Sequence, residues 1–111
     1  MVLAFTTLAV HRDQKAEFAR AGLLVVEQVR AEPGCAACQL FHDLGSDGTF
    51  VVISEWSSLA TLEQHLLGQA YRQMLALMEL SQPCVVSFHT VRCTKGMELV
   101  HQALAKADEP C

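Results

Sequence analysis

Stretches typical of β-strands alternate along this chain with stretches whose apolar residues have helical spacing. Four stretches are rich in Val, Ile, Leu, Phe and Thr, the residue types that suit a buried strand. The turn sequence Gly45-Ser46-Asp47-Gly48 separates the two middle stretches, which predicts a β-hairpin. The predicted strands cover residues 2–10, about 35–44, about 49–56 and 84–93.

The segment after the first predicted strand has the spacing of an amphipathic helix. Its apolar residues recur every three or four positions, which places them on one helix face. These residues are Phe18, Ala21, Val25 and Val29, with Leu24 beside them. Asp13 is the predicted N-cap. Glu32-Pro33-Gly34 ends the helix, because proline cannot continue it and glycine suits the turn.

Further helical segments are predicted after the hairpin and near the C-terminus. Ser57 or Ser58 caps the first of them. Its apolar stripe consists of Leu59, Leu62 and Leu66. Gly68 weakens this helix, and a second helical piece extends to Ser81-Gln82-Pro83. The residues of that piece expected to face inward are Tyr71, Met74, Leu75 and Met78. Gly96 ends the last predicted strand, and a tail helix follows with its apolar positions at Met97, Val100, Leu104 and Ala107.

The predicted order of elements is β-α-β-β-α-β, followed by a short tail helix. This order is typical of the ferredoxin-like α+β fold, in which a four-stranded antiparallel sheet carries its helices on one face. The chain has 111 residues, about the size of one domain. We therefore expect one domain over residues 1–111, with the ferredoxin-like unit over about 2–93 and the helical tail over about 96–108.

The second face of the predicted sheet has no covering element in this pattern. The third strand nevertheless has apolar side chains on both faces, with Val51 and Ile53 on one and Phe50 and Val52 on the other. An antiparallel sheet that faces water normally alternates apolar with polar residues. We therefore expect a homodimer in which two sheets pack face to face.

Composition and charge exclude several classes of function. Hydrophobic residues make up 51% of the chain and charged residues 18%, which is the balance of a folded domain and not of a disordered chain. The net charge of −4 leaves no basic patch to neutralise phosphates, so nucleic acid is not an expected partner. No apolar run approaches the roughly 20 residues that span a bilayer, so we expect no membrane association.

The N-terminal segment and the cysteine count bear on location. The first ten residues are apolar, but no Lys or Arg precedes them and they lack a cleavage site of the A-x-A type. We interpret them as a strand and expect a cytoplasmic protein. The five cysteines are an odd number, which argues against a fully paired secreted disulfide framework.

Three stretches of this sequence together resemble one known family. They are Glu32-Pro33-Gly34-Cys35 before a strand, Phe50-Val51-Val52-Ile53-Ser54-Glu55-Trp56 along a strand, and Leu62-Glu63-Gln64-His65-Leu66 on a helix. In this order, over about residues 2–93, they are similar to the antibiotic biosynthesis monooxygenase (ABM) domain. The resemblance implies a ferredoxin-like fold and a homodimer, the family's usual assembly.

The resemblance implies a choice between reactions. The family includes cofactor-independent quinol and anthrone monooxygenases, haem-degrading monooxygenases and proteins of other activity. Trp56 matches a tryptophan of both oxygenase types, and His65 resembles the helical histidine that binds iron in haem-degrading members. Val52 stands where anthrone-type members have an asparagine, and Thr6 or Thr7 stands where haem-degrading members have one.

Several side chains are candidates for chemistry on an aromatic substrate. Histidine exchanges protons near neutral pH, so His65 is the candidate general base. Trp56 is the candidate wall that stacks on a planar ligand. Either Tyr71, by a hydrogen bond, or Arg72, by its charge, is the candidate that stabilises a substrate anion. The full set of expected substrate-binding residues is Tyr71, Arg72, Val52 and Leu62.

Each of these candidates also has a purely structural interpretation. Helical spacing places His65 at the edge of the leucine stripe, where it would be a half-exposed surface residue. Trp56 is equally a core residue whose indole N–H finds one acceptor. Tyr71 is more often part of a core, and Arg72 is more often solvated.

The remaining cysteines and histidines indicate no metal or redox site. Cys35-Ala36-Ala37-Cys38 has redox spacing, but residues three apart in a strand are about 10 Å apart and point to opposite faces, whereas a disulfide needs Cα atoms within about 7 Å. No second such motif and no His-x-x-x-His spacing is present, so no metal is expected. His42 and His89 lie on predicted strands and are candidates for the dimer interface.

We therefore expect a cofactor-independent monooxygenase that acts with O₂ on a small aromatic substrate of the quinol or anthrone kind. Two other functions stay open: haem binding through His65, with or without degradation, and a non-catalytic dimer that binds a small ligand. The monooxygenase hypothesis predicts that the Trp56 indole and the His65 imidazole line one enclosed cavity between the sheet and the second helical region.

Overall fold

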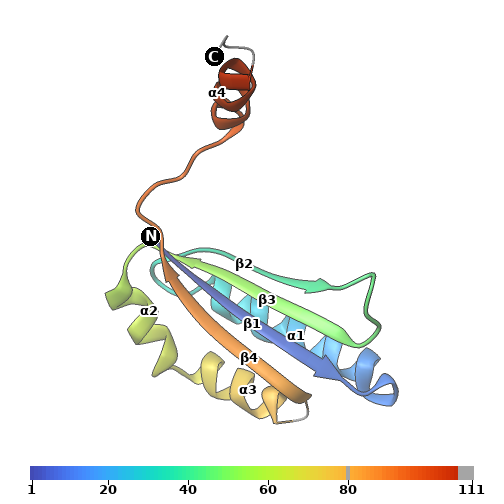
Figure 1. Cartoon of the computed structure of the whole chain (residues 1–111). Helices are drawn as coiled ribbons and strands as arrows, with labels where there is room; N and C mark the ends of the chain where they lie inside the picture. The colour runs from blue at the N-terminus through green and yellow to red at the C-terminus, as the bar shows by residue number, and fades with distance from the viewer. Residues whose placement is uncertain (80, 108–111) are drawn as a thin grey trace.

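The computed structural model describes residues 1–79 and 81–107 and contains one four-stranded antiparallel sheet with helices on one face (Figure 1). The strands are β1 (Val2–Val10), β2 (Cys35–His42), β3 (Thr49–Trp56) and β4 (Ser81–Thr90), and their order in the sheet is β2-β3-β1-β4. A 3₁₀ turn, η1 (Arg12–Gln14), precedes helix α1 (Lys15–Arg30). The other helices are α2 (Leu59–Leu66), α3 (Gln69–Met78) and α4 (Met97–Ala107). The predicted ferredoxin-like α+β fold is confirmed.

Two strand boundaries differ from the prediction. β2 ends at His42 and not near residue 44, because Asp43 begins the turn and its carboxylate accepts a hydrogen bond from the Gly45 N–H at 2.8 Å. β4 covers Ser81–Thr90 and not 84–93, so the segment predicted to end a helix is already strand. β4 lies at an edge of the sheet, where a proline without a backbone N–H is tolerated.

The predicted helix caps are right for α2 and wrong for α1. At α2, the Thr61 N–H donates to Ser58 Oγ at 3.2 Å, and the Ser58 N–H donates to Thr61 Oγ1 at 3.3 Å. These reciprocal bonds form a capping box, which satisfies backbone donors that the helix itself cannot pair. Asp13 caps nothing. It lies inside η1, and its own N–H donates to Nδ1 of His11.

The core lies between the sheet and helices α1, α2 and α3. Side chains of β1 and β3 alternate between buried and less buried positions, so one face of the sheet packs against the helices. The buried residues of α1 are Phe18, Gly22, Val25, Val26 and Val29. Those of α2 are Leu62 and His65, and those of α3 are Ala70 and Met74. The predicted inward positions Phe18, Val25, Val29, Leu62 and Met74 are buried, whereas Leu24, placed beside the first predicted stripe, and the predicted inward residues Leu59 and Leu75 are exposed.

The other face of the sheet is uncovered in the part of the chain that the structure describes. We call it the open face and define it by Leu3, Phe5, Thr7, Val51, Ile53, Val85 and His89. His89 contacts the Phe5 ring edge-on, with centroids 5.3 Å apart. His42 was expected on this side, but it pairs with Phe50 and stacks on its ring, so it belongs to the helix-covered face.

Helix α4 stands apart from the rest of the fold (Figure 1). It follows the segment 91–96, and none of its residues, Met97–Ala107, is buried. The tail helix predicted from its apolar spacing is therefore present. No helix within residues 1–79 and 81–107 combines the length and apolarity needed to cross a lipid bilayer.

Candidate active site

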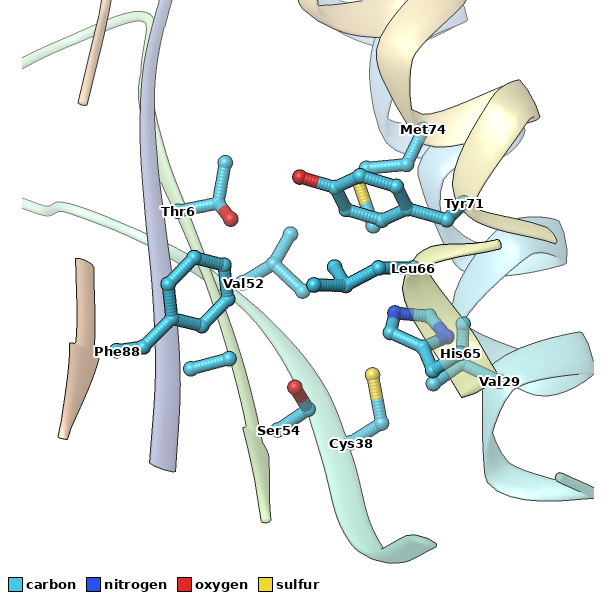
Figure 2. A pocket seen from close by; sticks show the side chains of 11 residues that line it. Thr6, Val29, Cys38, Val52, Ser54, His65, Leu66, Tyr71, Met74 and Phe88 are labelled. Atoms are coloured by element: carbon cyan, nitrogen blue, oxygen red, sulfur yellow. The ribbon is translucent and has the colours of Figure 1, made fainter. Parts of the chain in front are cut away.

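A small cavity lies between the helix-covered face of the sheet and the helices (Figure 2). Its volume is about 20 Å³, which is room for about one water molecule. The strand register explains its floor, because Cys38, Ser54, Ala4 and Phe88 form one row across all four strands. Thr6 and Val52 are paired in a neighbouring row. These six residues line the sheet side of the cavity.

Helices α1, α2 and α3 form the side of the cavity opposite the sheet. The lining residues are Val29 from α1, His65 and Leu66 from α2, and Tyr71 and Met74 from α3. Most of the wall is therefore apolar, with a small number of hydroxyl, thiol and imidazole groups. Small-molecule sites are typically built in this way, since the apolar wall excludes water and the few polar groups orient the ligand.

His65 is buried and held by a carboxylate. Nδ1 of His65 lies 2.5 Å from Oε2 of Glu32, and the histidine side chain is only 6% exposed. Because a carboxylate accepts hydrogen bonds, this contact places a proton on Nδ1 and leaves Nε2 as the nitrogen available to a ligand. The expectation of a half-exposed surface histidine is wrong. An imidazole oriented by a carboxylate is the arrangement that general bases use in many enzymes.

The turn after α1 brings Glu32 to α2. Gly34 has a φ of +83°, in the left-handed region that favours glycine, and a Cβ there would lie 2.4 Å from the Thr61 Cβ. The Ser57 N–H also donates to the Gly34 carbonyl oxygen at 2.8 Å. The turn is thus packed against the first turn of α2, and His65 lies one turn further along that helix. The segment predicted only to stop a helix therefore also positions the histidine.

Trp56 lies behind His65. The indole is fully buried and stacks on the imidazole, with centroids 4.5 Å apart and an interplanar angle of 25°. The indole N–H donates to Ser54 Oγ at 2.9 Å. Tyr71 meets the same imidazole edge-on, with centroids 5.3 Å apart. The imidazole, and not the indole, therefore presents its ring to the enclosed cavity.

The two rings do share a hollow, but it is a different one. This second hollow has a volume of about 260 Å³ and is partly open to solvent. Its lining residues are Glu32, Pro33, Trp56, Thr61, Gln64 and His65. Both rings therefore line one hollow, as expected, but this hollow is not sealed from solvent, and Trp56 does not line the smaller cavity.

The structure brings half of the predicted site residues together. His65, Tyr71 and Val52 line the enclosed cavity. Leu62 is buried in the core next to this region but does not line the cavity, and Arg72 is exposed on α3. Neighbouring residues of a helix point about 100° apart, so Arg72 turns away where Tyr71 turns inward.

Sequence reasoning missed Glu32 and Ser54 as site residues. Ser54 could have been recognised from the sequence, because it is polar whereas the other alternate, buried positions of β3 are apolar. Thr6 carries the same signal on β1. Glu32 carried no local signal as a site residue, since its role depends on contact with a residue 33 positions away.

Cys35 and Cys38 point to the same face of the sheet, contrary to the prediction. A bulge between Cys35 and Ala37 changes the alternation, so Cys35 pairs with Trp56 and Cys38 with Ser54. Both are free thiols. Burial raises the pKa of the Cys38 thiol to about 12, so this group stays protonated near neutral pH. Among residues 1–79 and 81–107, no cluster of three or more His, Cys, Asp or Glu side chains could hold a metal ion.

Comparison with known proteins agrees with this architecture. In sequence, the chain is 29% identical over 65 residues to YcnE of Bacillus subtilis (strain 168), a candidate monooxygenase; the match covers 59% of this chain and 68% of YcnE. In structure, it is similar to a candidate antibiotic biosynthesis monooxygenase from Deinococcus radiodurans, with a TM-score of 0.80 and 20% identity over 86% of this chain and 97% of the other.

A second structural relative is a variant of SnoaB, a cofactor-independent oxygenase from Streptomyces nogalater. Its TM-score is 0.73 and its identity 22%, over 84% of this chain and 94% of SnoaB. Both structural matches support the fold. The family model for antibiotic biosynthesis monooxygenase matches residues 1–77, more than half of the sequence. The chain therefore belongs to the antibiotic biosynthesis monooxygenase (ABM) family.

Proposed function

We propose that this chain is a cofactor-independent monooxygenase that transfers one atom of O₂ to a small phenolic or quinol-type substrate. The observation that carries the proposal is the Glu32–His65 pair at the wall of a small, largely apolar cavity. Family membership supports an oxygenase, and the likeness of fold to SnoaB supports a reaction without a cofactor.

The proposed reaction begins with a proton transfer. Nε2 of His65 removes a proton from the phenol, and the Glu32 carboxylate stabilises the imidazolium that forms. The electron-rich anion donates one electron to O₂, and the two radicals then combine into a peroxide on the ring carbon. The imidazolium returns its proton to this peroxide. Loss of water converts the ring C–H into a carbonyl, so that phenol and O₂ give a quinone and water without an external reductant.

The cavity must open to admit such a substrate. Its volume of about 20 Å³ is far below the roughly 300–1,000 Å³ of typical small-molecule sites. Phe88 is the most exposed of the lining residues, and Leu66 and Tyr71 are half-buried. These three side chains can move with less loss of packing than the fully buried ones, so we infer that the substrate enters between them.

The cavity is less suited to haem than to a small phenol, because its lining residues within the described chain include no Lys or Arg to pair with the propionates. We therefore favour a small neutral aromatic compound over haem.

We also propose that the functional unit is a homodimer. The open face combines Phe5, Val51, Ile53 and the exposed Val85 on one side of the sheet. A second copy of the chain is the expected partner, since a twofold contact buries the same apolar face of both copies.

Oxygen consumption tests the proposed function directly. The purified full chain is incubated without added cofactor and with a panel of hydroquinones, naphthols, anthrone and haem. We expect consumption of one O₂ per phenolic substrate, with water and not hydrogen peroxide as the second product. A protein that consumes no O₂ with any member of the panel, or only forms peroxide, is instead a non-catalytic binding dimer. A Soret shift on haem addition that is lost in His65→Ala would identify a haem protein.

A further inference from the structure

Hydroxyl groups from two strands and one helix surround the enclosed cavity beside His65. They belong to Thr6, Ser54 and Tyr71, and in Figure 2 the tyrosine hydroxyl points from the helix side toward the strand that carries Thr6. Thr6 of β1 pairs with Val52 of β3, and Ser54 lies on β3 two residues after Val52. Thr6 and Ser54 are therefore diagonal neighbours on the helix-covered face, and both line the same small cavity.

The Ser54 hydroxyl has a defined direction. The Trp56 indole N–H donates to Ser54 Oγ at 2.9 Å, which occupies an acceptor position of the serine oxygen. Among the described residues, no protein group accepts the hydrogen of this hydroxyl in return. The hydrogen is thus free to point into the cavity, and the bond from the indole polarises the hydroxyl and makes it a stronger donor.

The Thr6 side chain lines the cavity without a hydrogen bond to any other side chain that the structure describes. The residue is 7% exposed overall. No fully buried side-chain N or O atom in residues 1–79 and 81–107 lacks a hydrogen-bond partner, so the Thr6 hydroxyl is not sealed within the core. A ligand in the cavity that Thr6 lines is therefore able to reach this hydroxyl.

We propose that Thr6 and Ser54 form an oxyanion subsite that binds the phenolate oxygen of the substrate, with the Tyr71 hydroxyl closing its helix side. The proposal rests on the function proposed above and specifies how the substrate is held. The cavity lining described here contains no Lys or Arg, so neutral donors stabilise the negative charge, as they do in oxyanion holes. Such a site accommodates one anionic oxygen, and it therefore selects uncharged phenols over aromatic acids.

A phenol that reports its own ionisation tests this subsite. 4-Nitrophenol is suitable, because the phenol and phenolate forms absorb at different wavelengths and the compound resists oxidation. The spectrum of the bound compound is recorded against pH with the full chain as wild type, Thr6→Val and Ser54→Ala. Ser87→Ala is the matched control, since it removes a serine hydroxyl from the opposite face of the sheet.

We expect the wild type to bind 4-nitrophenol and to lower its pKa relative to the free compound. Each of Thr6→Val and Ser54→Ala raises the pKa of the bound compound by about one unit, a tenfold change, because one hydrogen bond to a charged oxygen is lost. Ser54→Cys keeps the side-chain size with a weaker donor and gives a smaller shift, and Ser87→Ala gives none. The other ionisable groups near the cavity are His65, Cys38, Tyr71 and Glu32, and all remain in every variant.

Folding is monitored through Trp56, which is the only tryptophan of the chain. A wild type that does not bind 4-nitrophenol, or that binds it with the pKa of the free compound, overturns the subsite. The subsite is also overturned if folded Thr6→Val and Ser54→Cys variants bind 4-nitrophenol with the same pKa as the wild type does. The two proposals fail separately: loss of the subsite with normal O₂ consumption contradicts the subsite alone, and normal phenolate stabilisation without O₂ consumption contradicts the monooxygenase alone.

Discussion

The two faces of the β-sheet differ: one buries polar residues, and the other leaves apolar residues exposed. On the helix-covered face, the polar residues Thr6 and Ser54 are more than nine-tenths buried beside the His65 ring. On the open face, Val85 is exposed and the apolar side chains of Phe5 and Val51 are only half-buried. The same strands supply both faces, because side chains alternate along each strand.

Each of these deviations has a physical cost. Buried polar groups lose hydration, and exposed apolar groups order water, so neither arrangement contributes to the stability of an isolated domain. The buried polar groups surround a cavity, which indicates a ligand. The exposed apolar groups form a continuous face, which indicates a partner. We therefore call the helix-covered face the chemical face and the open face the assembly face, after the roles proposed for them.

Removal of the proposed base on the chemical face has the largest expected effect. In His65→Ala we expect the rate of O₂ consumption to fall by a factor of about 10² to 10⁴, the usual contribution of a general base. The matched control is His101→Ala on helix α4, an exposed histidine away from both faces of the sheet, which is expected to retain turnover. Initial rates with the best phenol of the panel measure both. Full turnover in His65→Ala would remove this residue from the mechanism.

A charge on the assembly face is expected to break the dimer. Val51 lies on the open face between Thr7 of β1 and Phe41 of β2. In Val51→Glu, a twofold interface would bury two unpaired carboxylates, and burial of an uncompensated charge costs about 3–5 kcal/mol. We expect the dissociation constant to rise at least about 100-fold. Light scattering after size-exclusion chromatography, over a series of concentrations, measures this change.

The control for the dimer is a charge placed elsewhere on an exposed apolar side chain. Leu99→Glu changes helix α4, which stands apart from the sheet, and is expected to leave the dimer intact. Equal dissociation in both variants would move the interface to α4. A Val51→Glu protein with the wild-type mass would show that the open face is not the contact.

The fold was predictable because its signals are local. Apolar spacing and turn residues define each element, and the order of elements limits the topology to few choices. The errors arose where a single side chain or a tertiary contact determines where an element begins or ends. The Asp43 carboxylate ends β2 early, and β4 begins before its proline because it is an edge strand.

The site was predictable only in part, for the same reason. Family resemblance identified His65 and Trp56, but helical spacing alone did not indicate that His65 is buried between Trp56 and the cavity. The role of Glu32 depends on Gly34, which allows the turn to pack against Thr61 of α2. Such a contact joins residues far apart in the sequence, and no local pattern encodes it.

Glu32 offers a smaller and more selective change on the chemical face. Glu32→Gln keeps the size of the side chain but removes the charge that orients His65 and stabilises the imidazolium. We expect kcat to fall about 10- to 100-fold, as for other residues that orient a functional histidine. KM should change little, because Glu32 does not line the enclosed cavity.

Glu63→Gln is the matched control for this residue. Glu63 lies on the same helix as His65 but is exposed, so its loss should affect neither kcat nor KM. A Glu32→Gln protein that raises KM and keeps kcat would mean that Glu32 contacts the substrate and does not act through the histidine.

The buried thiol of Cys38 gives the smallest effect and reports on stability. Burial raises the pKa of this group from 9.0 to about 12 in the folded protein. Above about pH 9 the unfolded chain therefore releases a proton that the native state retains, so stability present at lower pH is lost progressively as the pH rises to 12. By about pH 10 this loss amounts to about 1 kcal/mol. Denaturant unfolding at several pH values measures it.

Cys38→Ala should weaken this alkaline slope, whereas Cys93→Ala, which removes an exposed thiol, should leave it unchanged. The slope is a property of the chemical face, because Cys38 lies in the same row of the sheet as Ser54. If the slope persists in Cys38→Ala, the thiol is hydrated in the native state. Water would then reach the cavity floor, and neutral hydroxyls there would stabilise a phenolate less than a dry site allows.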